Sequence, residues 1–208
     1  KVFKKVIEYI KENNIKYLFI SGDLYEQKYI KKSTIEYINN LFKEIPETKI
    51  FISPGNHDPY TKNSYYNNFY WSENVKIFTS KIEKIECEDC NIYGYGFDDF
   101  YCKNSGIENV NLDDKNKLNI LIIHGTLDGG TIENSEYNPL SSKILKEKEP
   151  DYKYTDSDEY ADYYKSVIEE PDLLSYSDKH IDNVGQEMIL NDYEQFIKET
   201  YNIINEKI

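Results

Sequence analysis

The stretch at residues 50–60 reads Ile-Phe-Ile-Ser-Pro-Gly-Asn-His-Asp-Pro-Tyr. It begins as a run of strand-forming residues and breaks at a Pro-Gly pair, which favours a turn. The break places Asn56, His57 and Asp58 together where the strand ends. In an open α/β sheet, ligands bind at the carboxyl ends of the strands. An amide, an imidazole and a carboxylate at this place indicate a site for metal binding or proton transfer.

Two other stretches repeat this pattern. Residues 15–20 are apolar and lead to a glycine that is followed at once by Asp23. Residues 118–123 are a second apolar run, which ends in His124 and another glycine. Three predicted strands therefore each end in a potential metal ligand beside a glycine. The combination indicates a site at the carboxyl ends of the strands.

These motifs resemble the central motifs of the calcineurin-like metallophosphoesterases: Gly-Asp at 22–23, Gly-Asn-His-Asp at 55–58 and His-Gly at 124–125. The flanking residues, Ser-Gly-Asp-Leu-Tyr-Glu at 21–26 and Ile-His-Gly-Thr-Leu at 123–127, resemble the DNA-repair exonuclease branch. That branch includes the nuclease subunit that partners an SMC-like ATPase in bacteria. The resemblance covers about residues 1–152, and Gly-Asn-His-Asp is its most specific part.

The resemblance implies an α/β fold in which two facing mixed β-sheets are flanked by helices, a four-layer sandwich. We expect a metallophosphoesterase core at residues 1–150, without its usual first strand. We expect an acidic segment and a C-terminal helical appendage at residues 151–208, with the helix beginning near residue 186.

The resemblance also implies a role for each site residue. Asp23 would bridge two divalent ions, and Asn56 and His124 would bind the second of them. His57 would donate a proton to the leaving oxygen or stabilise transition-state charge. Asp58 would orient His57. We expect two Mn²⁺ ions, with Fe or Zn²⁺ as alternatives, because these metals suit oxygen and imidazole ligands.

Two motifs of the family are missing from the sequence, an Asp-x-His on the first strand and a Gly-His-x-His after the His-Gly strand. Either the sequence omits segments of the protein, or the protein is a degenerate homologue that lacks one metal position. The third of the chain's 3 histidines is His180, which lies in an acidic segment. Such a position is typical of a surface histidine, so we do not expect His180 to replace a ligand.

The composition and net charge of the chain restrict the functions that we expect for it. The 208 residues are 39% hydrophobic, enough for a packed core, and no apolar run has the length of a membrane span. No secretory signal pattern opens the chain, so we expect a cytoplasmic protein without membrane contact. The net charge of −13 would on average repel DNA. Three alternatives follow: local basic patches bind DNA, a partner protein supplies the contact with DNA, or the substrate is not DNA.

Periodicity predicts the elements around the site. Apolar residues at three-to-four spacing indicate helices at residues 1–13 and 33–45. Ser33 and Glu36 have the form of a capping box for the second helix, and Pro46 would end it. The strand-helix-strand order makes strands 15–20 and 49–53 parallel.

The following residues are predicted as loop, hairpin and short strands. Residues 59–74 read as a loop with helical turns, whose aromatic side chains pack over the sheet. Short strands at 75–78, 81–86 and 91–97 indicate a second, more antiparallel sheet. Cys87 and Cys90 have the spacing of half a zinc site, but no further ligands lie near, so a hairpin turn is favoured. A short helix would begin at Pro139.

The leading functional prediction is a metal-dependent phosphodiesterase resembling a DNA-repair exonuclease, with DNA as substrate and an SMC-like ATPase as partner. A second hypothesis keeps the metal chemistry but places it on a nucleotide or phosphoprotein, which an acidic surface tolerates better. A third is a metal-poor scaffold that binds a partner through its C-terminal helix. The sequence does not determine the oligomeric state.

Overall fold

The structure is a computed structural model that describes residues 2–103, 106–112, 117–127 and 136–148. The chain divides into two compact units, Lys1–Pro150 and Asp151–Ile208. All of the second unit lies outside the described residues. The predicted acidic segment, the C-terminal helix and the surface position of His180 fall there and stay predictions.

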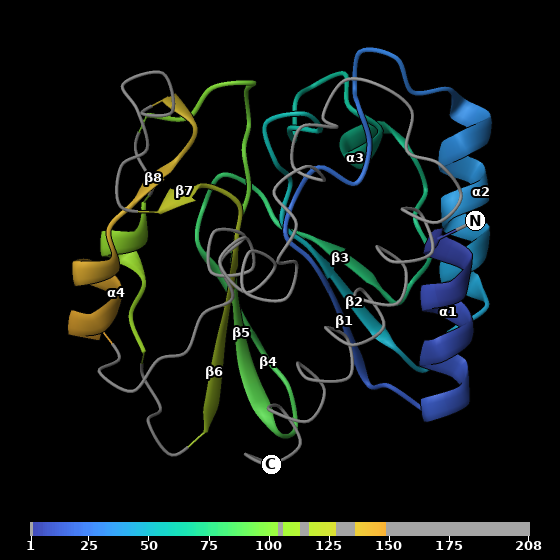
Figure 1. Ribbon diagram of the computed structural model, residues 1–208, viewed down its shortest axis with the longest axis horizontal. Coiled ribbons are helices and arrows are strands. Elements are labelled where there is room, and N and C mark those ends of the chain that lie inside the picture. The colour runs from blue at the N-terminus through green and yellow to red at the C-terminus, as the bar shows by residue number, and fades with distance from the viewer. Residues whose placement is uncertain (1, 104–105, 113–116, 128–135, 149–208) are drawn as a thin grey trace, which may run out of the picture. The chain divides into compact units, whose positions relative to one another are not determined.

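The described part contains two three-stranded sheets, with strand orders β1-β2-β3 and β4-β5-β6, and a small pair formed by β7 and β8. Figure 1 shows α1 and α2 against the first sheet and α4 on the far side of the second. The elements are α1 Val2–Asn13, β1 Tyr17–Ile20, α2 Lys32–Lys43, β2 Lys49–Ile52, α3 Tyr65–Asn68, β3 Val75–Ile77, β4 Glu83–Glu86, β5 Cys90–Tyr95, the 3-10 helix η1 Ile107–Asn109, β6 Leu118–Ile123, β7 Thr126–Leu127, β8 Pro139–Leu140 and α4 Ser142–Lys148.

The predicted fold class is confirmed, but the first sheet is parallel throughout its described strands and includes β3. The second sheet is mixed, since β4 and β5 are antiparallel whereas β5 and β6 are parallel. In the first sheet β1 pairs with β2 and β2 pairs with β3, both in parallel. Ile50 of β2 lies opposite Val75 of β3. The prediction of this strand in the second sheet is therefore wrong. Short strands with tight connections do not reveal which edge they pair with.

Alternation along the strands defines the layers. Ile50 and Ile52 of β2 belong to the cluster formed with α1 and α2, while Phe51 between them packs with the second sheet. In β5, Ile92 faces the first sheet, and Tyr93 faces the outer layer that contains η1 and α4. Fully burying an isoleucine contributes about 1.5–3 kcal/mol, so a one-residue slip in register would be strongly unfavourable.

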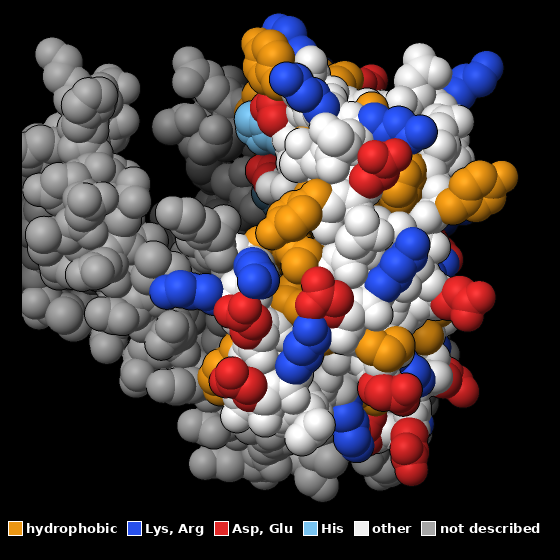
Figure 2. Space-filling view, turned by 90° about the vertical axis from the view of Figure 1, so that its right-hand side faces the viewer, with side chains coloured by type: hydrophobic (Ala, Val, Ile, Leu, Met, Phe, Trp, Pro, Cys, Tyr) orange, Lys and Arg blue, Asp and Glu red, His pale blue; other side chains and the backbone are white. Residues whose placement is uncertain are grey.

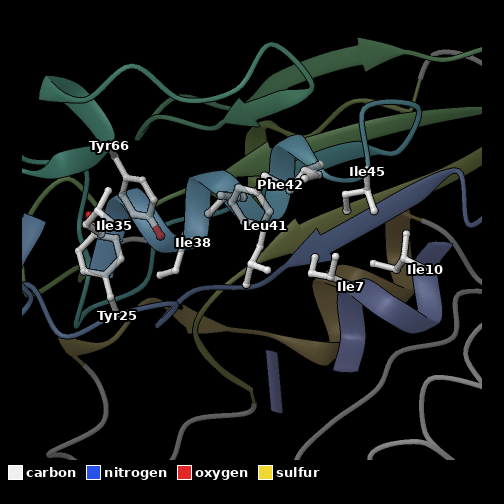
Figure 3. Close-up of a cluster of buried hydrophobic side chains, with 11 residues drawn as sticks. Ile7, Ile10, Tyr25, Ile35, Ile38, Leu41, Phe42, Ile45 and Tyr66 are labelled. Carbon is white, nitrogen blue, oxygen red and sulfur yellow. The ribbon is translucent and has the colours of Figure 1, made fainter. Parts of the chain in front are cut away.

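Helices α1 and α2 cover the outer face of the first sheet, as Figure 3 shows. Their buried residues recur every three or four positions, which is the spacing of one helix face. In α1 the innermost residues are Ile7 and Ile10. Helix α2 presents Ile35, Ile38, Leu41 and Phe42, followed by Ile45 just after its end.

The capping box predicted for α2 is wrong. The N-cap residue is Lys31, which makes no side-chain capping bond, and the helix begins at Lys32. Ser33 therefore already lies inside the first turn, where its hydroxyl cannot act as the cap. The packing of the apolar face determines where this helix begins more strongly than the local motif does.

The loop at residues 59–74 contains one short helix, α3, and its aromatic residues pack as predicted except Tyr70, which is 97% exposed. Tyr66 is buried and Trp71 packs against the α1–α2 cluster. The hairpin predicted at Cys87 and Cys90 is confirmed, with the Cys87 amide donating to the Cys90 carbonyl at 2.8 Å.

Pro139 lies in β8 instead of the first turn of a helix, and α4 begins only at Ser142. Within the described residues, no helix is long and apolar enough to cross a membrane.

Candidate metal and catalytic site

The carboxyl ends of β1, β2 and β6 meet, and they bring together the three predicted metal ligands. Nε2 of His124 lies 3.0 Å from Oδ1 of Asn56 and 3.6 Å from Oδ2 of Asp23. The ring of His124 also rests edge-on against buried Phe97, with 5.6 Å between ring centroids. Residues separated by up to 101 positions thus share one point at the junction of the two sheets.

The hydrogen bonds of His124 favour a cation at this point. Its Nδ1 lies 2.8 Å from the carbonyl oxygen of Ser21, which can only accept, so Nδ1 carries the hydrogen. In the neutral imidazole Nε2 then presents a lone pair. That lone pair faces the amide oxygen of Asn56 and the carboxylate of Asp23, both also acceptors. Three lone pairs directed at one another fit a divalent ion between them.

The ring of His124 lies so close to the backbone before Asp23 that position 22 must be a glycine. Gly22 has φ +89°, and a Cβ there would lie 2.6 Å from Nδ1 of His124. Asp23 itself has φ 55°, a left-handed conformation that is strained for most residues and that Asp tolerates. Strain of this kind is typical of functional sites.

Asp58 holds this strained backbone in place. Its fully buried carboxylate accepts hydrogen bonds from the amides of Gly55, Asp23 and Leu24 at 2.7, 3.0 and 2.7 Å. It also accepts one from the hydroxyl of Tyr66 at 2.6 Å. Burial raises the pKa of Asp58, although these four hydrogen bonds oppose the rise. Asp58 therefore joins the loop that carries Asp23 to the loop that carries Asn56.

His57 is oriented by a different residue from the one we predicted. Its Nδ1 lies 2.6 Å from Oε2 of Glu26, whereas Asp58 bonds to the four donors above. The reason is burial: Asp58 lies beneath the loop, while the side chains of His57 and Glu26 are 54% and 39% exposed. The backbone reinforces the pairing, since the Gln27 amide donates to the His57 carbonyl at 2.9 Å.

The hydrogen bond between Glu26 and His57 shifts both groups toward their charged forms. It raises the pKa of His57 and lowers the pKa of Glu26. A protonated His57 that bonds to Glu26 through Nδ1 keeps its Nε2–H free to donate to a bound group. The pair is thus suited to proton donation.

An open pocket of about 320 Å³ adjoins the site. Two of the predicted site residues, Asn56 and His57, form part of its lining. The remaining lining residues are Glu26, Lys28, Phe100, Tyr101 and Tyr137.

Sequence reasoning missed Glu26 and Tyr66. Glu26 stands three positions after Asp23, but its pairing depends on how the loops at residues 21–27 and 54–58 meet. Tyr66 was one of many aromatic residues in a loop without a regular period. No local signal distinguished either residue.

The described residues hold no group of three or more His, Cys, Asp or Glu side chains arranged to bind a metal. The convergent set has two such residues and an asparagine, which together suit one ion position. The two family motifs absent from the sequence would be the source of further ligands.

An α/β sandwich that brings a carboxylate, an amide and an imidazole together at its strand ends is compatible with metal-dependent hydrolysis of phosphate esters. The family model of the calcineurin-like phosphoesterases matches residues 1–178, and the chain belongs to this family. A comparison with the curated proteins finds no match. Members of the family are hydrolases of phosphate esters that typically bind two divalent ions.

Proposed function

We propose that this protein is a phosphodiesterase of the DNA-repair exonuclease type, which hydrolyses the phosphodiester bonds of DNA with Mn²⁺ as its metal. The observation that carries the proposal is the convergence of Asp23, Asn56 and His124 on one point, with the His57–Glu26 pair beside it. Divalent ions, when bound, would supply an activated water and neutralise charge on the phosphate.

The chain's own residues have separate tasks in this proposal. Asp23, Asn56 and His124 would hold the ion through Oδ2, Oδ1 and Nε2. His57 would place its Nε2–H at the leaving oxygen and transfer a proton as the ester bond breaks. Glu26 would keep His57 charged and fix its ring, and Asp58 would keep the ligand loops in register.

The DNA-repair branch is supported by the motifs Ser-Gly-Asp-Leu-Tyr-Glu at 21–26 and Ile-His-Gly-Thr-Leu at 123–127. The face formed by α1 and α2 gives little support for independent binding of duplex DNA. Figure 2 shows lysine and acidic side chains interspersed over the face formed by α1 and α2. Several of them pair, as Lys11 does with Glu44. We therefore propose that a partner subunit, an SMC-like ATPase, supplies the contact with duplex DNA.

The acidic charge favours a second candidate, the same chemistry on nucleotides or phosphoproteins. One experiment separates the two. The full chain is stripped of metal, supplied with Mn²⁺ and given labelled DNA, a dinucleotide and a phosphopeptide in parallel. Mn²⁺-dependent cleavage of DNA that is lost in His124→Ala supports the proposal. Cleavage of the phosphopeptide without cleavage of DNA would contradict it, and cleavage of none would favour the metal-poor scaffold.

A further inference from the structure

We propose that the pocket beside His57 binds an unpaired nucleobase next to the scissile phosphate, by stacking it on Phe100 and Tyr101. The inference rests on the proposed function and deepens it, because it names the substrate class. The shared chemistry is a nucleotide whose base is not stacked in a duplex. Such a base is found in a free nucleotide and in a single-stranded or frayed DNA end.

The first observation is an aromatic wall beside the site, formed by the side chains of Phe100, Tyr101 and Tyr137. Phe100 and Tyr101 are 42% and 56% exposed, and Tyr101 lies against Tyr137 with 5.8 Å between the ring centroids. All three line the same pocket as Asn56 and His57. The other large exposed aromatic side chains of the described residues, Tyr29, Tyr37 and Tyr70, do not line the pocket. Aromatic faces beside a phosphate site are typical platforms for base stacking.

The second observation is that hydrogen bonds connect the segment that carries Phe100 and Tyr101 to His124, a predicted metal ligand. The backbone of Cys102 pairs with that of the neighbouring segment, donating to Glu136 and accepting from Asn138, at 2.6 Å in each bond. The buried side chain of Asn138 donates in turn to the carbonyl oxygen of His124. Short hydrogen bonds thus connect the residue after Tyr101 to His124 itself.

Close packing strengthens this connection. A Cβ at Gly125 would lie 2.3 Å from the carbonyl oxygen of Asn138, so only glycine permits the contact. The adjacent amide of Thr126 donates to the carbonyl oxygens of Tyr137 and Asn138 at 3.1 and 3.2 Å. The aromatic wall therefore keeps a fixed place relative to the phosphate position, as a base-binding subsite requires.

The charge of the pocket lining favours a short substrate whose base is unpaired. Among the described residues that line the pocket, Lys28 is the one lysine or arginine, and the other cationic group, protonated His57, is paired with Glu26. Such a lining can neutralise little of a phosphate backbone. A base in the interior of a duplex has both faces covered by its neighbours and cannot stack on a protein ring. The site therefore selects for a free base face and not for many phosphates.

The test measures binding, so that it does not depend on hydrolysis. The full chain is titrated with thymidine 5′-monophosphate and with 2-deoxyribose 5-phosphate, which lacks only the base. We expect the nucleotide to bind about 5- to 150-fold more tightly, the range for one stacked base. Phe100→Ala and Tyr101→Ala should each reduce this ratio. Phe100→Leu, which keeps an apolar side chain without a ring, should reduce it too.

Tyr70→Ala is the matched control, because Tyr70 is 97% exposed and does not line the pocket. Its binding ratio should equal that of the wild type. Equal affinity of the wild type for the two ligands would overturn the proposal, as would a ratio that Phe100→Ala and Tyr101→Ala leave unchanged. A ratio that falls equally in Tyr70→Ala would overturn it as well.

Hydrolysis by the same preparations separates this inference from the proposed function. Absence of Mn²⁺-dependent hydrolysis together with a base-dependent binding ratio would refute the proposed function and leave the base pocket supported. Hydrolysis without a base preference would do the reverse. A single-stranded oligonucleotide and a dinucleotide, each compared with a duplex, identify the source of the base. Faster cleavage of the blunt duplex than of both others would contradict the inference.

Discussion

Nδ1 of His57 lies 2.6 Å from Oε2 of Glu26, a contact between the loops that follow two neighbouring parallel strands. Glu26 belongs to the loop after β1 and His57 to the loop after β2. The contact raises the pKa of His57 and fixes its ring beside the converging metal ligands. In the proposed mechanism this pair supplies the proton, and the converging ligands hold the metal.

Replacement of Glu26 by Gln removes the charge that stabilises protonated His57 but preserves the size of the side chain. We expect turnover to fall by about 10- to 100-fold, part of the ~10²–10⁴-fold that a general acid typically contributes. Affinity for Mn²⁺, measured by calorimetry, should stay unchanged. Glu36→Gln is the control, because Glu36 pairs with Lys32 on the exposed face of α2. Unchanged turnover in Glu26→Gln would remove Glu26 from the mechanism.

His57→Gln tests the role of the imidazole itself. If His57 donates a proton and binds no metal, turnover should fall by about 10²–10⁴-fold while Mn²⁺ content persists. Elemental analysis and single-turnover rates on one preparation supply both numbers. Loss of metal together with loss of rate would make His57 a ligand instead.

Asp58→Asn tests whether Asp58 acts on stability or on the reaction. The amide would lose part of the acceptor capacity that serves three backbone amides and the hydroxyl of Tyr66. We expect the free energy of unfolding to fall by about 3 kcal/mol, and by about 1–2 kcal/mol in Tyr66→Phe. Urea denaturation measures both. A variant as stable as the wild type but without turnover would place Asp58 in the chemistry.

We predict that the ionisation of Glu83 makes the free energy of unfolding depend on pH. Burial raises its pKa, but hydrogen bonds from Lys76 at 2.5 Å and from the Thr79 amide at 3.1 Å outweigh burial and lower it. A lowered folded-state pKa stabilises the protein above the unfolded pKa of about 4.3. This stabilisation is lost as pH falls through the folded value.

Glu83→Gln should therefore be less stable than the wild type near pH 6, and the difference should shrink toward pH 3. Denaturation of both proteins across this range measures the difference. A difference that grows as the solution is acidified would contradict the assignment, because it would require a raised pKa in the folded protein.

The strand ends could be predicted because they rest on local patterns, and the fold class followed from the resemblance of the motifs to the calcineurin-like family. Apolar runs that lead into glycine-containing turns predict both the strands and the edge at which Asp23, Asn56 and His124 meet. The hairpin at Cys87 and Cys90 followed from two flanking strands in the same way.

Features that depend on tertiary contacts could not be read from the sequence. The pairing of Glu26 with His57 needs the relative position of two loops, and the burial of Asp58 needs Tyr66 to close over it. The partner of β3 depends on which edge of β2 is free. The start of α2 at Lys32 follows from packing, although Ser33 supplies a capping motif.

The metal position has its own test in Asp23→Asn and His124→Ala. Each removes one ligand atom from the converging set, so each should abolish metal-dependent hydrolysis. The folds should stay intact, because the two side chains are partly exposed, at 37% and 25%. Circular dichroism checks the fold. Full activity in either variant would remove that residue from the site.

The most direct test of the account is a Mn²⁺ titration of phosphodiester hydrolysis by the metal-stripped full chain, with His124→Ala in parallel. The account predicts that the wild type is inactive without metal and gains activity to saturation as Mn²⁺ is added. It predicts that His124→Ala stays inactive at the Mn²⁺ concentrations that saturate the wild type. Hydrolysis by the metal-free wild type, or an identical titration curve for His124→Ala, would contradict it.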